Sequence, residues 1–200
     1  ITTTSGCTAT AVASQWITVG NHPVANFSYT PAVMCFGDTV HFTDLSTPAD
    51  SITAWNWSYG DGNSAVLNNG SPYYHTYSSF GNFTVKLVAV SDKNCISDTA
   101  RQTVSVRAIP VVSFTLPSFV CMPNGTAVFN NTSVAPDNAP LTYSWDFGDG
   151  LPGSTDQSPS HVYVTTRTSA TVTLTATSGP GCTATSSQTL VNFFDKPLAD

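Results

Sequence analysis

The residues that could bind a metal or transfer a proton are few and scattered. His75 and His161 each stand without the Cys or carboxylate cluster that a zinc site requires, so we expect structural rings hydrogen-bonded to backbone. Asp61, Asp146 and Asp149 are weak candidates for Ca²⁺, which binds oxygen ligands, and the closeness of Asp146 to Asp149 favours that pair. None has the Asp-x-Asp-x-Asp pattern of a dedicated calcium loop, and we expect no resident metal or cofactor.

Catalytic arrangements are also weakly indicated. Two carboxylates across a groove would suggest glycoside hydrolysis. Asp146, however, ends a predicted strand and Asp149 lies in the turn after it, so the turn alone explains their spacing. The sequence has no Gly-x-Ser-x-Gly motif, which marks the nucleophile of many hydrolases. We therefore expect no catalysis within these residues.

The composition limits both the partners and the fold. The 200 residues carry 6 basic and 12 acidic side chains, a net charge of −6, and every acidic residue is Asp. Nucleic acid and anionic membranes require a cationic face, so we expect neither as a partner. No apolar run approaches the roughly 18 residues of a membrane span. A chain rich in Thr, Ser and Val and without Glu favours strands over helices.

The sequence repeats itself with a period close to 87 residues. Trp57 recurs at Trp145, and the segment Gly6–Thr10 returns almost letter for letter at 181–185. We expect each repeat to be a domain. The boundaries that we predict are 1–22 for the C-terminal strand or strands of a preceding repeat, 23–109 and 110–196 for two whole repeats, and 197–200 for the start of a following one.

Within each repeat the apolar residues alternate with polar ones, which is the pattern of half-buried strands. Val40 and Phe42 alternate with polar neighbours, as do Trp55 and Trp57. This pattern predicts an all-β fold of tandem antiparallel sandwiches with about seven strands each. We expect strands near 24–29, 39–44, 52–59, 64–68, 72–77, 82–91 and 95–106, and near 111–116, 126–130, 141–147, 154–157, 159–163, 169–178 and 182–191.

Two motifs in each repeat resemble those of the PKD (polycystic kidney disease) domain. One is a Trp strand followed by Gly-Asp-Gly, whose glycines permit a tight turn. The other is a His-x-Tyr segment that begins with Pro. The motif residues are Trp57, Gly60, Asp61, Gly62, His75 and Tyr77, and Trp145, Gly148, Asp149, Gly150, His161 and Tyr163. In the second repeat the sequence departs from the PKD pattern after Tyr163, and residues 164–167 predict a longer or altered loop there.

The resemblance implies immunoglobulin-like sandwiches in an extracellular, non-catalytic array. Such repeats form the stalks of bacterial surface adhesins, including those of gliding species, and also accessory modules of secreted chitinases, proteases and collagenases. We expect a stiff spacer at the cell surface, with a carbohydrate-binding or accessory segment of a secreted hydrolase as the alternative. Its expected partners are neighbouring repeats, surface polysaccharide and other adhesin chains.

The five cysteines fall into two recurring classes, which favours disulfides in an oxidising compartment. Cys35 and Cys121 precede the second expected strand, whereas Cys7, Cys95 and Cys182 begin the last one. The simplest scheme joins Cys35 to Cys95 and Cys121 to Cys182, within each repeat. In a sandwich of this connectivity the two classes lie at opposite ends, about 20 Å apart, and a disulfide needs Cα atoms within about 7 Å.

Stacking the repeats end to end would bring the two classes together. We therefore favour Cys35–Cys182 as a bridge between repeats. Cys95 would then pair with the preceding repeat, Cys121 with the following one, and Cys7 with an earlier one still. The bridge within each repeat stays open as the alternative.

Surface candidates are weaker. The segments 38–40, 50–52 and 98–100 resemble the short O-glycan acceptor motif of gliding-type bacteria, so Ser51, Thr99 and Thr39 are candidate acceptors, with Ser51 favoured. The doublets Tyr73-Tyr74 and Phe193-Phe194 lie on expected strands, so one ring of each should point outward. An outward ring could stack on a sugar or be covered at a repeat junction.

Overall fold

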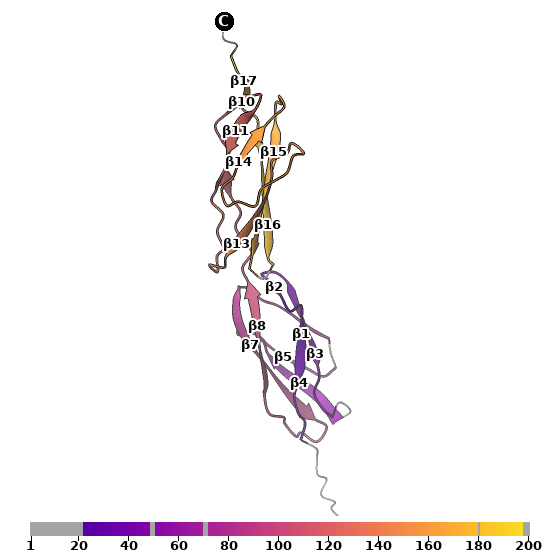
Figure 1. Cartoon of the computed structure of the whole chain (residues 1–200). Coiled ribbons are helices and arrows are strands. Elements are labelled where there is room, and N and C mark those ends of the chain that lie inside the picture. The colour runs from indigo at the N-terminus through magenta and orange to yellow at the C-terminus, as the bar shows by residue number, and fades with distance from the viewer. Residues whose placement is uncertain (1–21, 49–50, 70–71, 180, 198–200) are drawn as a thin grey trace, which may run out of the picture.

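The computed structural model describes residues 22–48, 51–69, 72–179 and 181–197, which form two β-sandwiches stacked end to end (Figure 1). The elements of the described part of the chain are strands, and no helix in it is long and apolar enough to cross a membrane. This is the all-β tandem sandwich fold that the alternating pattern predicts. Cys7, the expected strand in residues 1–21 and the last three residues of the expected fourth repeat lie outside the described residues.

The first domain packs a three-stranded sheet against a five-stranded one. The smaller sheet has the order β1-β3-β6 and the larger β2-β8-β7-β4-β5. Neighbours are antiparallel, except that β2 runs parallel to β8. The strands are β1 (Phe27–Thr30), β2 (Met34–Cys35), β3 (Thr39–Asp44), β4 (Ile52–Ser58), β5 (Ser64–Leu67), β6 (Tyr73–Thr76), β7 (Gly81–Ser91) and β8 (Ala100–Arg107).

The second domain has the same plan with shorter ladders. Its largest sheet is β13-β15-β16, and three two-stranded pairs surround it: β9 with β12, β11 with β14, and β10 with β17 in parallel. The strands are β9 (Phe114–Thr115), β10 (Val120–Met122), β11 (Gly125–Val128), β12 (Asn130–Asn131), β13 (Leu141–Asp146), β14 (Ser160–Tyr163), β15 (Ala170–Ser178), β16 (Thr183–Leu190) and β17 (Phe193–Asp195).

Each domain has its own hydrophobic core, built around a Trp between two Phe rings. In the first domain the Trp57 ring lies 5.0 Å from Phe27 and 5.2 Å from Phe42. In the second, Trp145 lies 5.1 Å from Phe114 and 5.7 Å from Phe129. The two core clusters share no residue, so each sandwich has a hydrophobic core of its own, as a separate domain does.

Three strand predictions were wrong or incomplete. The strand expected at 154–157 is absent from the described fold, where Ser154 makes only an isolated bridge to Trp145. The last strand of the first domain begins at Ala100 and not at Cys95, because Cys95 lies in the turn that precedes it. The short parallel strands β2 and β10 were not foreseen, since two or three residues give no measurable alternation.

Candidate functional site: a stapled domain junction

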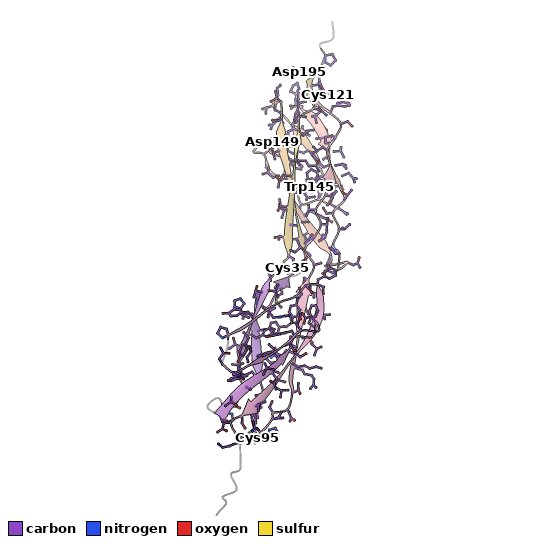
Figure 2. All side chains as sticks on the ribbon, turned by 180° about the vertical axis from the view of Figure 1, so that it is seen from behind. Cys35, Cys95, Cys121, Trp145, Asp149 and Asp195 are labelled. Atoms are coloured by element: carbon purple, nitrogen blue, oxygen red, sulfur yellow. A yellow bond between two sulfur atoms is a disulfide. The ribbon has the colours of Figure 1, made fainter. Side chains whose placement is uncertain are left out.

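A disulfide joins the two domains at the point where they meet. Cys35 and Cys182 are bonded, with their Cα atoms 5.6 Å apart and a sequence separation of 147 positions. Cys35 ends β2, and Figure 2 shows it where the first domain meets the second; Cys182 directly precedes β16 of the second domain. This is the pairing favoured from end-to-end stacking. The alternative, with Cys35–Cys95 and Cys121–Cys182, is not formed.

The backbone around Cys35 is held on both sides. Its strand pairs in parallel with β8, which places Cys35 opposite Arg107, and the N–H of Phe36 donates to the Arg107 carbonyl at 2.8 Å. A tight turn follows, in which the Asp38 carboxylate accepts the Cys35 N–H at 2.8 Å. The Asp38 N–H in turn donates to the Cys35 carbonyl at 3.0 Å. The backbone of Cys35 is therefore held by the last strand of its own domain and by the turn at Asp38.

The backbone around Cys182 is held by a hairpin between β15 and β16. The Ser178 N–H donates to the Cys182 carbonyl at 2.8 Å, and the Gly181 N–H donates to the Ser178 carbonyl at 2.8 Å. Gly181 has a φ of +117°, which L side chains rarely adopt, so glycine suits this turn. The Cys182 side chain is buried, and its sulfur lies 3.9 Å from the Met34 carbonyl oxygen of the first domain.

The peptide linker is the second connection between the domains, and it too is held. Ala108, directly after β8, is buried, and its N–H donates to the Asp137 carboxylate of the second domain at 3.3 Å. Val111 and Val134 then exchange backbone hydrogen bonds of 2.9 and 3.0 Å. The few residues between β8 and β9 are thus attached to the second domain almost from their start.

An apolar cleft spans the same junction. Phe36 and Phe80 come from the first domain, Ile109 from the linker and Pro136 from the second domain. Each of the two Phe rings is 43 % exposed. Both domains and the linker therefore contribute apolar surface to a single boundary.

The other two described cysteines, Cys95 and Cys121, are unpaired and half-buried. Figure 2 shows them at opposite ends of the molecule, Cys95 at the lower end of the first domain and Cys121 at the upper end of the second. They therefore lie far from each other and from the bridge.

The two motif histidines correct one expectation. Each was expected to bond backbone, but His75 Nε2 lies 2.7 Å from the Asp61 carboxylate, and His161 Nε2 lies 2.7 Å from that of Asp149. His75 also stacks on Tyr59 at 4.0 Å between ring centroids. The two pairs occupy equivalent places, with Asp in the Gly-Asp-Gly turn and His on the strand that faces it. The Asp that precedes a His by 14 or 12 residues in both repeats was a signal that could have revealed them.

Burial alone would raise the pKa of each motif carboxyl, but its hydrogen bonds outweigh burial. Asp61 accepts the Asn63 N–H at 3.0 Å and the His75 ring, and its pKa lies below the ordinary value of 3.8. Asp149 accepts the Leu151 N–H at 3.1 Å and the His161 ring, and Arg167 also lowers its pKa. Both carboxylates are therefore ionised at neutral pH, and each accepts a backbone hydrogen bond within its own turn.

The three calcium candidates lie in these same turns. The Asp146 carboxylate accepts the Gly148 N–H at 2.9 Å, so it too caps local backbone. The part of the chain that the structure describes contains no group of three or more His, Cys or Asp side chains placed to hold a metal ion. The arrangement that the residues do form is a set of capped turns.

The first glycine of each Gly-Asp-Gly lies against a neighbouring strand. Gly60 has a φ of +85°, and a Cβ added to it would lie 2.7 Å from the Thr84 carbonyl oxygen. At Gly148, with a φ of +73°, the same atom would lie 2.3 Å from the Thr171 oxygen. Neither the backbone angle nor the space admits a side chain, so both positions require glycine.

The motif tyrosines tie their strand to this turn from the other side. The Tyr77 hydroxyl donates to the Tyr59 carbonyl at 3.1 Å, and the Tyr163 hydroxyl donates to the Phe147 carbonyl at 2.9 Å. Burial, together with the charge of Asp149, raises the pKa of Tyr163 to about 12. The Asp, the His, the Tyr and the first Gly of each motif therefore all help to fix one turn in each domain.

The surface candidates occupy different settings. Thr39 is exposed on β3, whereas Ser51 and Thr99 are half-buried and Ser51 donates to the Pro48 carbonyl at 3.3 Å. Each aromatic doublet has one inward and one outward ring, as the strand pattern predicts. Tyr74 is 57 % and Phe194 58 % exposed, while their partners pack against the cores.

Comparison with known proteins gives matches over both domains. A family model described as PKD domain matches residues 20–106 and 107–192. The PKD1 domain of Vibrio anguillarum Epp is 24 % identical over 43 % of this chain and 94 % of its own, with a TM-score of 0.36. The PKD1 domain from the Vibrio cholerae metalloprotease PrtV is 25 % identical over 43 % and 98 %, with a TM-score of 0.36. The fibronectin(III)-like modules of Clostridium thermocellum CbhA are 13 % identical over 86 % and 94 %, with a TM-score of 0.45.

Proposed function

The chain belongs to the PKD domain family as a tandem pair of domains, and we propose that the pair is a stiff extracellular spacer in the stalk or filament of a secreted cell-surface protein. We extend the proposal to adhesins of the kind that gliding bacteria carry. PKD domains are non-catalytic modules, and PKD domains with a disulfide are typical of extracellular bacterial proteins.

The observation that carries the proposal is the double connection at the junction. Two domains joined by one flexible linker can bend and twist about it. Here the linker is held by the hydrogen bond from Ala108 to Asp137, and a second covalent link joins Cys35 to Cys182. Two separate attachment points restrict the bending and twisting that a single linker would allow, and the apolar cleft at the junction lies beside them.

Stiffness of this kind suits a protein that presents a distal group away from the cell. An array whose repeats contact only their neighbours has properties set by each junction, so a restrained junction yields an extended rod. Its partners are the adjoining repeats and, at the surface, polysaccharide or other adhesin chains. Thr39, Ser51 and Thr99 remain candidate O-glycan acceptors, with Thr39 the most accessible of them.

Small-angle X-ray scattering tests this proposal on the whole chain. We expect the oxidised protein to scatter as a single elongated shape, and the Cys35→Ser/Cys182→Ser variant to scatter as an ensemble of bent shapes. The matched control is Cys95→Ser/Cys121→Ser, which removes two cysteines but keeps the bridge and should scatter as the parent does. Equal conformational breadth in the oxidised parent and the bridge variant would refute a stiffening role.

A carbohydrate-binding or accessory module of a secreted hydrolase is the second candidate. The exposed Tyr74 ring favours it, because this ring lies 4.7 Å from His41 beside a shallow groove lined by Tyr73, Pro72 and Leu67. An exposed aromatic ring next to polar groups can stack on a sugar. Glycan-array binding that is lost in Tyr74→Ala and kept in Phe194→Ala would support this candidate, whereas a spacer should bind no glycan.

A further inference from the structure

The two unpaired cysteines occupy the same structural positions as the two bridged ones. We propose that Cys95 and Cys121 are the halves of two further disulfides between domains, each formed with a PKD repeat of this type stacked end-on. Cys121 bonds the following repeat through the residue equivalent to Cys182, and Cys95 bonds the preceding repeat through the residue equivalent to Cys35. This inference rests on the junction geometry, independently of where the array is anchored.

Cys121 reproduces the setting of Cys35. Each lies on a short strand that runs parallel to the last strand of its domain. The residue opposite it on that strand is Arg107 for Cys35 and Phe194 for Cys121. The residue before each cysteine, Met34 or Val120, is buried in the core of its domain. The thiol of Cys121 is thus held at the rim of the second domain as that of Cys35 is held at the rim of the first.

Cys95 reproduces the setting of Cys182. The Ser91 N–H donates to the Cys95 carbonyl at 2.9 Å, as the Ser178 N–H does to that of Cys182 at 2.8 Å. The residue before each cysteine donates its N–H to the carbonyl of the corresponding serine, Asn94 to Ser91 and Gly181 to Ser178. Both of these residues have a positive φ, +59° at Asn94 and +117° at Gly181. The same hairpin therefore presents the thiol at the lower end of each domain.

The chain path leaves the second domain as it leaves the first. β17 ends next to Cys121 at the upper end of the molecule, as β8 ends next to Cys35 (Figures 1 and 2). Pro197 comes three residues after Phe194, the residue opposite Cys121, just as Pro110 comes three residues after Arg107, the residue opposite Cys35. A following repeat would therefore be attached beside Cys121, with its own lower hairpin facing that thiol. The contact joins the upper end of one domain to the lower end of the next, which are different surfaces. Repeating this contact therefore builds an open row of domains and not a closed ring.

Bond formation requires an oxidant, for which we name a small disulfide such as oxidised glutathione. One thiolate attacks this disulfide and releases one reduced thiol, and the facing cysteine then displaces the second. The two cysteines together lose two protons and two electrons, and the oxidant becomes two thiols. An oxidising extracellular environment supplies this chemistry.

The test duplicates residues 23–196 within the whole chain, so that Lys196 is followed directly by a second Pro23. At this new junction the last residue of one repeat, Lys196, precedes the first Pro of the next, as Ile109 precedes Pro110 in the native chain. After oxidation with glutathione disulfide, we expect peptide mapping of the monomer to recover a Cys121–Cys95 linked peptide. Cys121→Ser in the first copy should abolish it, and Cys121→Ser in the second copy should leave it intact. If Cys121 of the first copy and Cys95 of the second copy are both alkylated in a protein that has formed Cys35–Cys182, the proposal is overturned.

A second measurement uses the unduplicated chain with Cys7→Ser. Oxidation at high concentration should give a ladder of linear multimers linked almost entirely through Cys95–Cys121 pairs. Random collision of two equally reactive thiols would make such mixed pairs only about half of all cross-links. Mixed pairs at or below that share would overturn the proposal, whatever the duplicated chain does.

Discussion

The two domains share the turn and the core but differ in the edge strand that follows the turn. In the first domain β5 pairs with β4 along four residues. In the second, the chain after Gly150 makes a single bridge to Trp145, and its backbone presses so close that a Cβ on Gly153 would overlap the Trp145 carbonyl. The same motif therefore permits two ways of covering the edge of the Trp strand.

This difference changes the environment of the central Trp. The Trp145 indole N–H donates to the Asp156 carbonyl at 3.0 Å, because the loop that replaces the edge strand passes over it. The indole N–H groups of Trp55 and Trp57 are buried without a hydrogen-bond partner among the described residues. The first domain instead buries more aromatic side chains, seven against five in the second. The two cores therefore differ in composition: the first holds more aromatic rings, and in the second the central indole N–H has a hydrogen-bond partner.

The largest expected effect is loss of the bridge, which should destabilise both domains. If one domain unfolds while the other stays folded, the bridge and the linker close a loop of about 70 residues, worth about 4 kcal/mol in the chain-entropy treatment. We expect Cys35→Ser/Cys182→Ser to lower both transitions in scanning calorimetry, with the second domain unfolding first because its core holds fewer aromatic rings. A shift of only one transition would show that the bridge restrains only that domain.

The next effect concerns the glycine that touches the neighbouring strand. Gly148→Ala should cost the second domain about 3 kcal/mol, from the left-handed backbone and the displacement of the strand that carries Thr171. Gly60→Ala should act similarly on the first domain, and somewhat less because its clash is milder. Each variant therefore assigns one calorimetric transition to one domain.

Gly150→Ala is the matched control for the second domain. Its φ is +77°, but open space surrounds the position of the added Cβ. We expect only the backbone cost of about 1 kcal/mol. A loss as large as that of Gly148→Ala would mean that strain of the turn, and not contact with the neighbouring strand, dominates at both positions.

A smaller effect separates the two central tryptophans. Trp145→Phe removes a donor and leaves the Asp156 carbonyl without it, whereas Trp57→Phe removes an N–H that has no partner in the described structure. Both changes lose similar apolar contact, so we expect Trp145→Phe to cost about 1 kcal/mol more. Denaturant titration of each variant measures the difference, and equal losses would contradict the contrast drawn between the domains.

The sequence was enough to predict the features that recur in both repeats, but not the individual contacts between residues of different elements. The alternation around Trp57 and the recurrence at Trp145 were enough to predict two sandwiches, and the two cysteine classes were enough to favour a bridge between them. The strand expected at 154–157 failed because Gly153 packs on the strand beside it, a contact that no alternation pattern encodes. The bond between His75 and Asp61 was missed because it joins a strand of one sheet to a turn that follows a strand of the other sheet.

The smallest effect is the response of the two Asp–His pairs to acid, and it again separates the domains. A carboxyl whose pKa is lower in the folded than in the unfolded protein stabilises the fold above its unfolded pKa of about 4, and this contribution is lost as the pH falls through the folded value. The pKa values of Asp61 and Asp149 are both lowered, so both domains should lose stability below about pH 4. Asp61→Asn and Asp149→Asn should each flatten this dependence in one domain.

Arg167 distinguishes the two pairs, because its charge helps to lower the pKa of Asp149 and its guanidinium lies 5.1 Å from the centre of the Tyr163 ring. Arg167→Gln should therefore raise the pKa of Asp149 and move the acid-induced loss of stability in the second domain to higher pH. The first domain has a different environment around Asp61, so its acid response should not move. Calorimetry between pH 2 and 6 measures both responses in one molecule. An equal shift in both domains would mean that the effect of Arg167 is one of net charge and not of its contact with this turn.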